Sequence, residues 1–321
     1  MEVARRSLGV AALATAAALL LVLARRRRRG GDAHARKRCF LQREARRYGY
    51  GATIDSWRLA ELPGLIPPLG RPPASDDAIV YLDHAGGALP HASQLDEAAH
   101  LCSASATCAN PHSTGPAAAR AAAAMERARR LVLEHCCGEH AHEWELVWTS
   151  GATAALRAAA EAFPFSAGRS AFAHIASAHT SVLGMRASAA AAGATCHCLS
   201  LEALLDAAVA ADAAVGLPST FPLPAGDDAP SSYVDHLIVL PAECNLTGDR
   251  LPIGPLFDAL STSAPAACGA PIPRGGRWWL LLDAAKAAST TPLDLHRTGA
   301  SMACISLYKL FGEPTGIGAL L

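Results

Sequence analysis

The most informative run in the chain is Trp278-Trp279-Leu280-Leu281-Leu282-Asp283-Ala284-Ala285. Its apolar residues are consecutive rather than alternating, which is typical of a strand buried in a parallel sheet. The run ends in one carboxylate, Asp283, and open α/β sheets bind their ligands beyond the carboxyl ends of their strands. Asp283 is therefore a candidate ligand-binding residue, with helix capping as the alternative role.

Strand-like and helix-like segments alternate along the chain from residue 76 onward. This alternation favours a mostly parallel sheet covered by helices on both faces. The predicted fold class is α/β, with residues 76–321 forming one large domain. We expect strands at residues 79–82, 145–149, 171–175, 237–240, 278–283 and 303–307, and helices at residues 117–135, 152–162, 181–191 and 201–210.

A turn of small residues, Thr149-Ser150-Gly151-Ala152-Thr153, separates a predicted strand from a predicted helix. It presents backbone N–H groups and hydroxyls at a helix N-terminus, an arrangement that suits a phosphate dianion. Ser-Gly turns are also common helix caps, so the motif alone leaves both roles open.

A third element ends in Ser306-Leu307-Tyr308-Lys309 and enters a loop with Gly312, Pro314, Gly316 and Gly318. A desolvated lysine beside other cations has a lowered pKa, which favours imine chemistry. A lone lysine on a loop is usually solvated surface. Lys309 becomes a candidate because three elements converge on one kind of site.

These three motifs resemble the fold-type I, class V aminotransferase superfamily, which includes the cysteine desulfurases. More narrowly, other segments are similar to the N-terminal domain of the molybdenum cofactor sulfurases. The resemblance covers residues 78–321 and implies a fold of the pyridoxal-phosphate-dependent transferases. The segments that carry it are Tyr81-Leu82-Asp83-His84-Ala85-Gly86, Asn110-Pro111-His112-Ser113, His179-Thr180-Ser181-Val182-Leu183-Gly184-Met185-Arg186 and Pro292-Leu293-Asp294-Leu295.

The resemblance implies a role for each matched residue around pyridoxal 5′-phosphate. Lys309 would attach the cofactor covalently and then move protons. Asp283 would pair with the pyridinium nitrogen, His179 would stack on the ring, and Asn245 would lie near the phenolic oxygen. The phosphate would be held by the remaining members of the set, Ala152, Thr153 and Ser306.

Two positions depart from the desulfurase pattern. Tyr308 precedes the lysine where many desulfurases have histidine. Lys286 stands where they often have a glutamine that faces the cofactor. Its ammonium group would either tune the ring or point to solvent.

The implied reaction takes sulfur from L-cysteine. A protein cysteine attacks the sulfur, alanine leaves, and the persulfide passes sulfur to the molybdenum cofactor or its carrier enzymes. Alternatives within the superfamily are a cysteine desulfurase for iron–sulfur assembly and a selenocysteine lyase. A non-catalytic, membrane-tethered paralogue is the alternative outside enzymes. We expect a homodimer if the fold is complete.

The resemblance also implies a smaller C-terminal domain with an arginine for the substrate carboxylate and a loop with the nucleophilic cysteine. Since the sequence ends at Leu321, soon after Lys309, we expect a truncated domain with an open sheet edge and no desulfuration by this chain alone. By sequence, Cys244 is the nearest candidate nucleophile, whereas Cys304 lies in a predicted core strand.

Residues 1–30 differ from the rest of the chain. Residues 8–24 are uncharged, rich in leucine and alanine, and followed by arginines at 25–29. This run is marginal for crossing ~30 Å of hydrocarbon. With its basic flank it predicts a transmembrane anchor that leaves the body on the cytosolic face, and an organelle transit peptide is the alternative. Residues 31–75 are a predicted connector, with a helix near 48–62.

Composition narrows the functional class. The 28 basic residues equal the 28 acidic ones, but arginine is crowded near the N-terminus, so the acidic remainder predicts no nucleic-acid binding. The ten cysteines indicate reduced thiols rather than a disulfide scaffold. Cys136-Cys137 has His135, His140 and His142 nearby but lacks zinc-knuckle spacing, so a metal site there is the less favoured interpretation.

Overall fold

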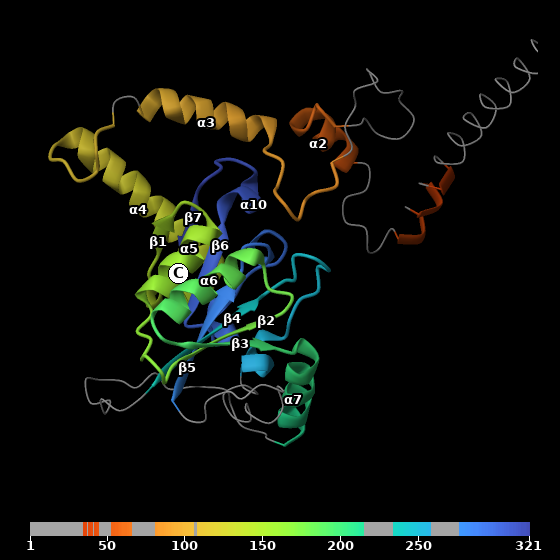
Figure 1. Ribbon diagram of the computed structural model, residues 1–321. Coiled ribbons are helices and arrows are strands. Elements are labelled where there is room, and N and C mark those ends of the chain that lie inside the picture. Colours follow the sequence, from red (N-terminus) through yellow and green to blue (C-terminus); the bar gives the residue numbers. More distant parts are fainter. Residues whose placement is uncertain are drawn as a thin grey trace, which may run out of the picture. The chain divides into compact units, whose positions relative to one another are not determined.

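The computed structural model describes residues 35–36, 38–40, 42–44, 53–65, 81–105, 108–214, 234–257 and 276–321. The chain divides into two compact units. One comprises Met1–Leu82 with His91–Gln94, and the other comprises Asp83–Pro90 with Leu95–Leu321. The second unit contains the sheet and the helices that pack on it (Figure 1).

In the first unit, helix α2 spans Thr53–Glu61, inside the predicted range of 48–62. Its last residue, Glu61, accepts hydrogen bonds at Oε2 from the backbone N (3.0 Å) and Oγ (2.8 Å) of Ser93. These two bonds lower the pKa of Glu61. Trp57 meets His91 edge-on, with 4.8 Å between the ring centroids. Ser93 and His91 thus hold the C-terminal half of α2.

The prediction of a transmembrane helix is corrected. Over the described ranges of the chain, no helix is both long enough and apolar enough to cross a bilayer. The predicted run, residues 8–24, itself lies outside these ranges.

The second unit is built on one mixed sheet, which has seven strands among the described residues (Figure 1). Their order is β1-β7-β6-β5-β4-β2-β3. The five strands from β6 to β3 are parallel, whereas β7 is antiparallel to both of its neighbours. The bounds are β1 Val147–Thr149, β2 Ala171–Ile175, β3 Thr195–Leu199, β4 Asp235–Pro241, β5 Arg277–Asp283, β6 Met302–Ser306 and β7 Gly318–Leu320.

The central strands show that both faces of the sheet are covered. Residues 237–240 of β4 and 280–282 of β5 are all 0% exposed. Successive side chains of a strand point to opposite faces, so a run without any exposed member requires packing on both. The predicted α/β class, with a mostly parallel sheet covered by helices, is confirmed.

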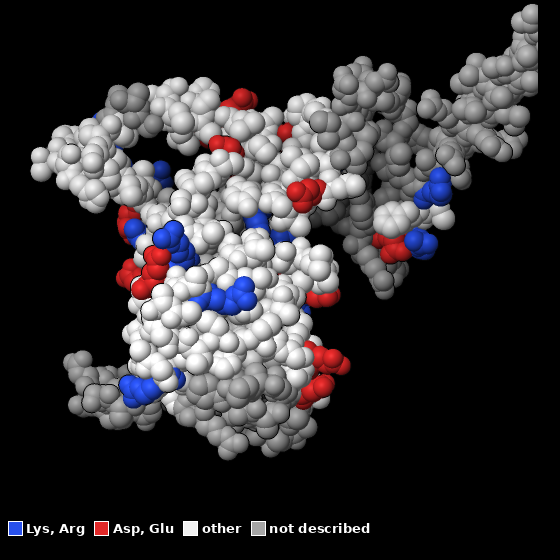
Figure 2. Space-filling view, in the orientation of Figure 1, with Lys and Arg blue, Asp and Glu red and all other residues white. Residues whose placement is uncertain are grey.

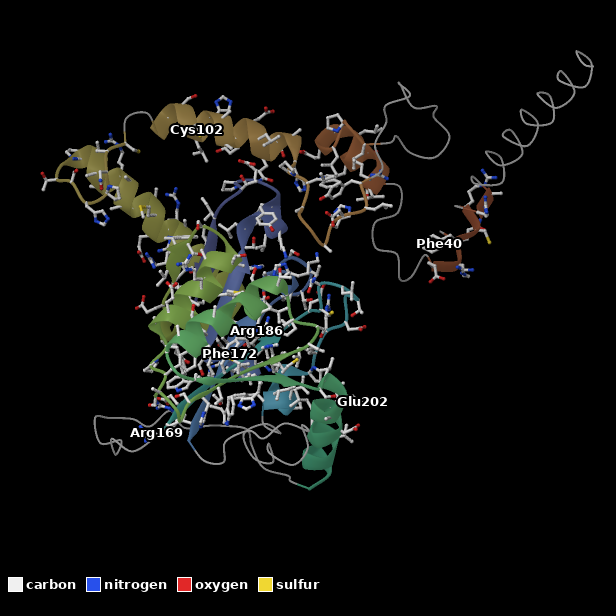
Figure 3. The ribbon with its side chains drawn as sticks, viewed as in Figure 1. Phe40, Cys102, Arg169, Phe172, Arg186 and Glu202 are labelled. Carbon is white, nitrogen blue, oxygen red and sulfur yellow. The ribbon has the colours of Figure 1, made fainter. Side chains whose placement is uncertain are left out.

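Helices α5 and α6 lie side by side over the sheet (Figure 1), α5 against β6 and β7 and α6 against β2 and β3. Phe172 of β2 is buried and Arg186 of α6 is exposed; both are labelled in Figure 3. The helices of this unit are α3 Ala92–Ser105, whose first residues belong to the other unit, α4 Pro116–Cys137, η1 Gly138–Glu143, α5 Ala152–Ala162, α6 Thr180–Ala191, α7 Leu201–Ala214, η2 Ala287–Ser289, α9 Leu295–Thr298 and α10 Leu307–Phe311.

Acidic and basic side chains lie close together on part of the outer surface (Figure 2). Two of the ion pairs join residues four apart on one helix, Arg130 with Glu134 on α4 at 3.7 Å and Arg157 with Glu161 on α5 at 2.7 Å. Such exposed pairs contribute only about 0.3–0.5 kcal/mol each. The helices are therefore held mainly by their buried faces.

Some elements differ from the sequence-based expectations. Tyr81 and Leu82 lie outside any strand, and Leu82 is 85% exposed; residues 79–80 lie outside the described residues. Strand β3 and helix α3 were not predicted. The expected open edge at the end of the chain is also wrong, because β7 pairs with β1 on one side and β6 on the other.

Candidate active site

A cavity of about 150 Å³ lies beyond the carboxyl ends of β4, β5 and β6 and against the N-termini of α5 and α6. Parallel α/β sheets bind their ligands at this edge. The cavity is lined by all seven predicted site residues, Ala152, Thr153, His179, Asn245, Asp283, Ser306 and Lys309. The structure therefore brings the predicted set together, while the role of each member stays a prediction.

The N-terminus of α5 forms one wall of this cavity. Gly151 precedes the helix with a φ of 114°, a conformation that favours glycine, and no side chain among the described residues caps this end. The first N–H groups of α5, including those of Ala152 and Thr153, therefore lack intrahelical partners and face a cavity that suits an anion.

Ser306, at the end of β6, supplies an unpaired hydroxyl at the same cavity. The residue is 1% exposed, and its Oγ has no hydrogen-bond partner among the described residues. A buried polar group without a partner costs about 1–3 kcal/mol. A phosphate oxygen bound between Ser306 and the start of α5 would remove this cost, so the residues present fit a phosphate-bearing cofactor.

Gly318 of β7 allows this strand to lie close to Gly151, in the turn that precedes α5 and that we call the anion-binding turn. A Cβ atom at this position would lie 2.7 Å from Gly151 Cα and 2.6 Å from Ile305 O. Both contacts are with backbone, which cannot rotate away. Glycine is therefore required for the start of α5 and the end of β6 to approach each other as they do.

Asp283 is a carboxylate of fixed orientation at the end of β5. It is 8% exposed, and its Oδ1 accepts hydrogen bonds from Ala285 N at 3.1 Å and Cys304 Sγ at 3.6 Å. A buried carboxylate needs hydrogen-bond donors or a cation as partners. A ring nitrogen that carries a proton would be such a partner in the cavity.

Lys309 lies on α10 rather than in a loop, because β6 ends at Ser306 and a short helix follows. Tyr308 O accepts hydrogen bonds from Ala88 N at 3.1 Å and Gly312 N at 2.9 Å. Gly312 has a φ of 77°, and a Cβ there would lie 2.7 Å from Ala88 O. The segment that contains Ala88 therefore packs against α10 and holds Lys309 at the cavity.

His179 caps the N-terminus of α6 and is oriented by Ser181. Its Nδ1 accepts a hydrogen bond from Ser181 N at 3.1 Å, which leaves the ring proton on Nε2. Ser181 Oγ lies 3.0 Å from this Nδ1 and 2.8 Å from Thr153 Oγ1. Ser181 thus links the predicted ring-stacking residue to the anion-binding turn, a role that the sequence reasoning missed although Ser181 stands in a quoted motif.

Lys286 also lines the cavity, but its ammonium group does not point to solvent alone. Nζ donates hydrogen bonds to His84 O at 3.0 Å and to Ser289 Oγ at 3.2 Å. The first of these bonds ties the Asp83–Pro90 segment to the loop that follows β5. Lys286 is therefore a support for the site wall, which neither sequence-based alternative anticipated.

Cys244 and Cys304 lie near the site in different environments. Burial raises the pKa of the Cys304 thiol well above its usual value, and the charge of Asp283 raises it further. Burial also acts to raise the pKa of Cys244, but hydrogen bonds from Thr247 and Leu246 outweigh it and lower the pKa. Thiolate chemistry is therefore more accessible to Cys244.

Comparison with known proteins agrees with this geometry. Residues 80–211 match the family described as aminotransferase class V.

Among curated proteins, the chain is similar to the molybdenum cofactor sulfurases. It is 34% identical to the one from Homo sapiens over 247 residues, which are 75% of this chain and 26% of that protein. It is 33% identical to the one from Arabidopsis thaliana over 256 residues, which are 77% of this chain and 31% of that protein. The chain thus spans less than a third of the length of these relatives.

Solved structures of similar fold include desulfurases. A cysteine desulfurase of Escherichia coli matches 77% of this chain and 55% of its own, with a TM-score of 0.52 and 21% identity. A cystine C–S lyase in complex with its product, cysteine persulfide, matches 75% of this chain and 56% of its own, with a TM-score of 0.54 and 18% identity. These likenesses show the α/β fold of type I.

Proposed function

We propose that the chain binds pyridoxal 5′-phosphate and is the cofactor-binding part of a sulfurtransferase of the molybdenum cofactor sulfurase type. The observation that carries this proposal is the unpaired Ser306 hydroxyl beside the free N-terminus of α5. This anion site shares one cavity with a buried carboxylate, Asp283, and an amine, Lys309. A phosphate, a ring nitrogen and an aldehyde on one molecule would match the three.

When bound, pyridoxal phosphate supplies an electron sink for chemistry at the α-carbon of an amino acid. Asp283 would hold the proton on the ring nitrogen. Lys309 would attach to the aldehyde carbon and serve as the base and acid at the substrate α-carbon. His179, in the orientation that Ser181 fixes, would cover the ring. The first N–H groups of α5 and the Ser306 hydroxyl would donate to the phosphate.

The proposed sulfur donor is L-cysteine and the proposed acceptor is the molybdenum cofactor, alone or on its carrier enzymes. The similarity to the molybdenum cofactor sulfurases supports the acceptor. The cystine C–S lyase of similar fold was solved in complex with its reaction product, cysteine persulfide, which supports sulfur chemistry at such a site. An assay that follows radiolabelled sulfur from L-cysteine tests this choice of donor and acceptor, and we expect the label on the molybdenum cofactor.

Hydrogen exchange at an amino-acid α-carbon tests the cofactor chemistry without requiring sulfur transfer. The protein loaded with pyridoxal phosphate is incubated with L-alanine in D₂O, and deuterium at Cα is followed by NMR. We expect exchange well above that of free cofactor. It should be lost in Lys309→Ala and retained in part in Lys286→Arg, which removes the other cavity amine but keeps a donor for His84 O. Exchange no faster than with free cofactor would contradict the proposal.

A further inference from the structure

Three potential metal ligands from two distant segments meet on the surface of the second unit. His140 and Glu143 belong to η1, which follows α4, and His296 lies on α9, which precedes β6. One ligand atom of each residue lies within 4.8 Å of the other two. None of the three residues lines the cofactor cavity, so this cluster is unused by the proposed function.

The two imidazole rings are stacked and aim the same nitrogen at one carboxylate. Their centroids are 3.6 Å apart with 4° between the ring planes. Nδ1 of His140 lies 2.9 Å from Glu143 Oε1, and Nδ1 of His296 lies 3.3 Å from Glu143 Oε2. Two ring nitrogens, one from η1 and one from α9, therefore lie next to the same carboxylate at the surface.

The ligand atoms are near enough to share one ion once the side chains turn. Ligand bonds of about 2.0–2.2 Å in tetrahedral geometry place ligand atoms roughly 3.3–3.6 Å apart. The 2.9 Å contact between His140 and Glu143 is a hydrogen bond that the ion would replace, and the stacked rings must rotate so that both Nδ1 atoms point at the ion. Three protein ligands would leave the fourth position for water.

Carboxylates beyond Glu143 surround the two rings. Glu139 Oε1 lies 3.9 Å from His140 Nε2, too far for a hydrogen bond but on the side of the ring where carboxylates stand behind metal-bound histidines. Asp294 also acts electrostatically on His140. These acidic groups favour a bound cation.

The cysteines nearest in sequence, Cys136 and Cys137, are buried and are not among the residues whose ligand atoms cluster here. His135 instead contacts Ala288 O at 3.5 Å. The cluster is therefore made of nitrogen and oxygen donors, a set that suits Zn²⁺ and its neighbours among the divalent transition metals.

We propose that His140, Glu143 and His296 form a binding site for a divalent transition metal ion, with Zn²⁺ as the test ion. The bound ion would tie η1 to α9. Because α9 leads into β6, which ends at Ser306, the ion would stabilise the strand that enters the cofactor site.

Zn²⁺ titration of the full chain, loaded with pyridoxal phosphate, tests this site by calorimetry and by thermal unfolding. Wild type and His296→Ala share all cysteines, so their difference isolates the cluster. We expect His296→Ala to bind one Zn²⁺ ion fewer, or to bind it with an affinity about 100-fold weaker. Loss of a group that only supports a metal ligand already costs up to about 100-fold in affinity. Zn²⁺ should raise the melting temperature of wild type and not that of the variant.

His142→Ala is the neighbouring control. His142 lies on the same turn with its Nδ1 on Glu139 O at 3.1 Å, and its Nε2 is 3.9 Å from Glu143 Oε1, but it is not one of the three clustered ligands. This variant should bind Zn²⁺ as wild type does. Equal binding by wild type, His140→Ala and His296→Ala would overturn the proposal. So would an equal loss in His142→Ala, since the effect would then belong to surface histidines in general.

Discussion

Single residues carry the chemistry of the cavity, and Asp283 is the most constrained of them. Backbone and thiol donors hold one of its oxygens, so the orientation of the carboxylate in the cavity is fixed. Sequence alone found Asp283 because an apolar strand ends there. It did not find Ser181, whose importance depends on the distance to Thr153 across two helices, and such distances leave no trace in local sequence.

The substitution Asp283→Asn tests the role of this charge. The amide has nearly the same shape, so the fold and cofactor binding should persist in part. The rate of α-carbon deuterium exchange should fall by about 10²-fold or more, the scale of losing a preorganised electrostatic group. An exchange rate equal to that of wild type would show that ring protonation does not depend on Asp283.

The cysteines offer a second prediction at this scale. Iodoacetamide reacts with thiolates, and the pKa of Cys244 is lowered while that of Cys136 is about 12. At neutral pH, peptide mapping should show Cys244 alkylated before Cys136, and Cys136 should gain reactivity only as the pH rises toward its pKa. Faster labelling of Cys136 at neutral pH would contradict these assignments.

At the scale of elements, long periodic helices and central apolar strands were predictable. Helices α4 to α6 begin and end within two residues of the predicted bounds. The edge strand β3, Thr-Cys-His-Cys-Leu, escaped prediction because it is largely exposed and polar in pattern. The three-residue strand β7 is too short to show periodicity, and its pairing is a tertiary property.

Gly318→Ala tests the close approach of β7 to the anion-binding turn. The added methyl group meets backbone atoms, so we expect destabilisation of about 1–3 kcal/mol in urea unfolding together with weaker cofactor binding. Gly184→Ala on α6 is the matched control, since nothing lies within 4 Å of its Cβ position. That variant should be neutral or more stable by up to about 1 kcal/mol. Equal stability of both variants would refute the close-approach argument.

For the molecule as a whole, the sheet turns separated sequence motifs into one site. Residues from several elements, among them the turn before α5 and helix α10, line one cavity. They meet there because the carboxyl ends of the parallel strands lie at one edge of the sheet. The set of proposed cofactor residues was available from sequence through family resemblance, since no local pattern alone implied it. The His140–Glu143–His296 cluster was not available, because η1 and α9 are joined only by the fold.

Covalent attachment of the cofactor to Lys309 is the central claim, and borohydride trapping tests it most directly. The protein is loaded with pyridoxal phosphate, reduced, digested, and the modified peptide is identified by mass spectrometry. We predict the label on Lys309, and none on that peptide in Lys309→Ala. Label on Lys286, which lines the same cavity, or on neither lysine, would contradict the account.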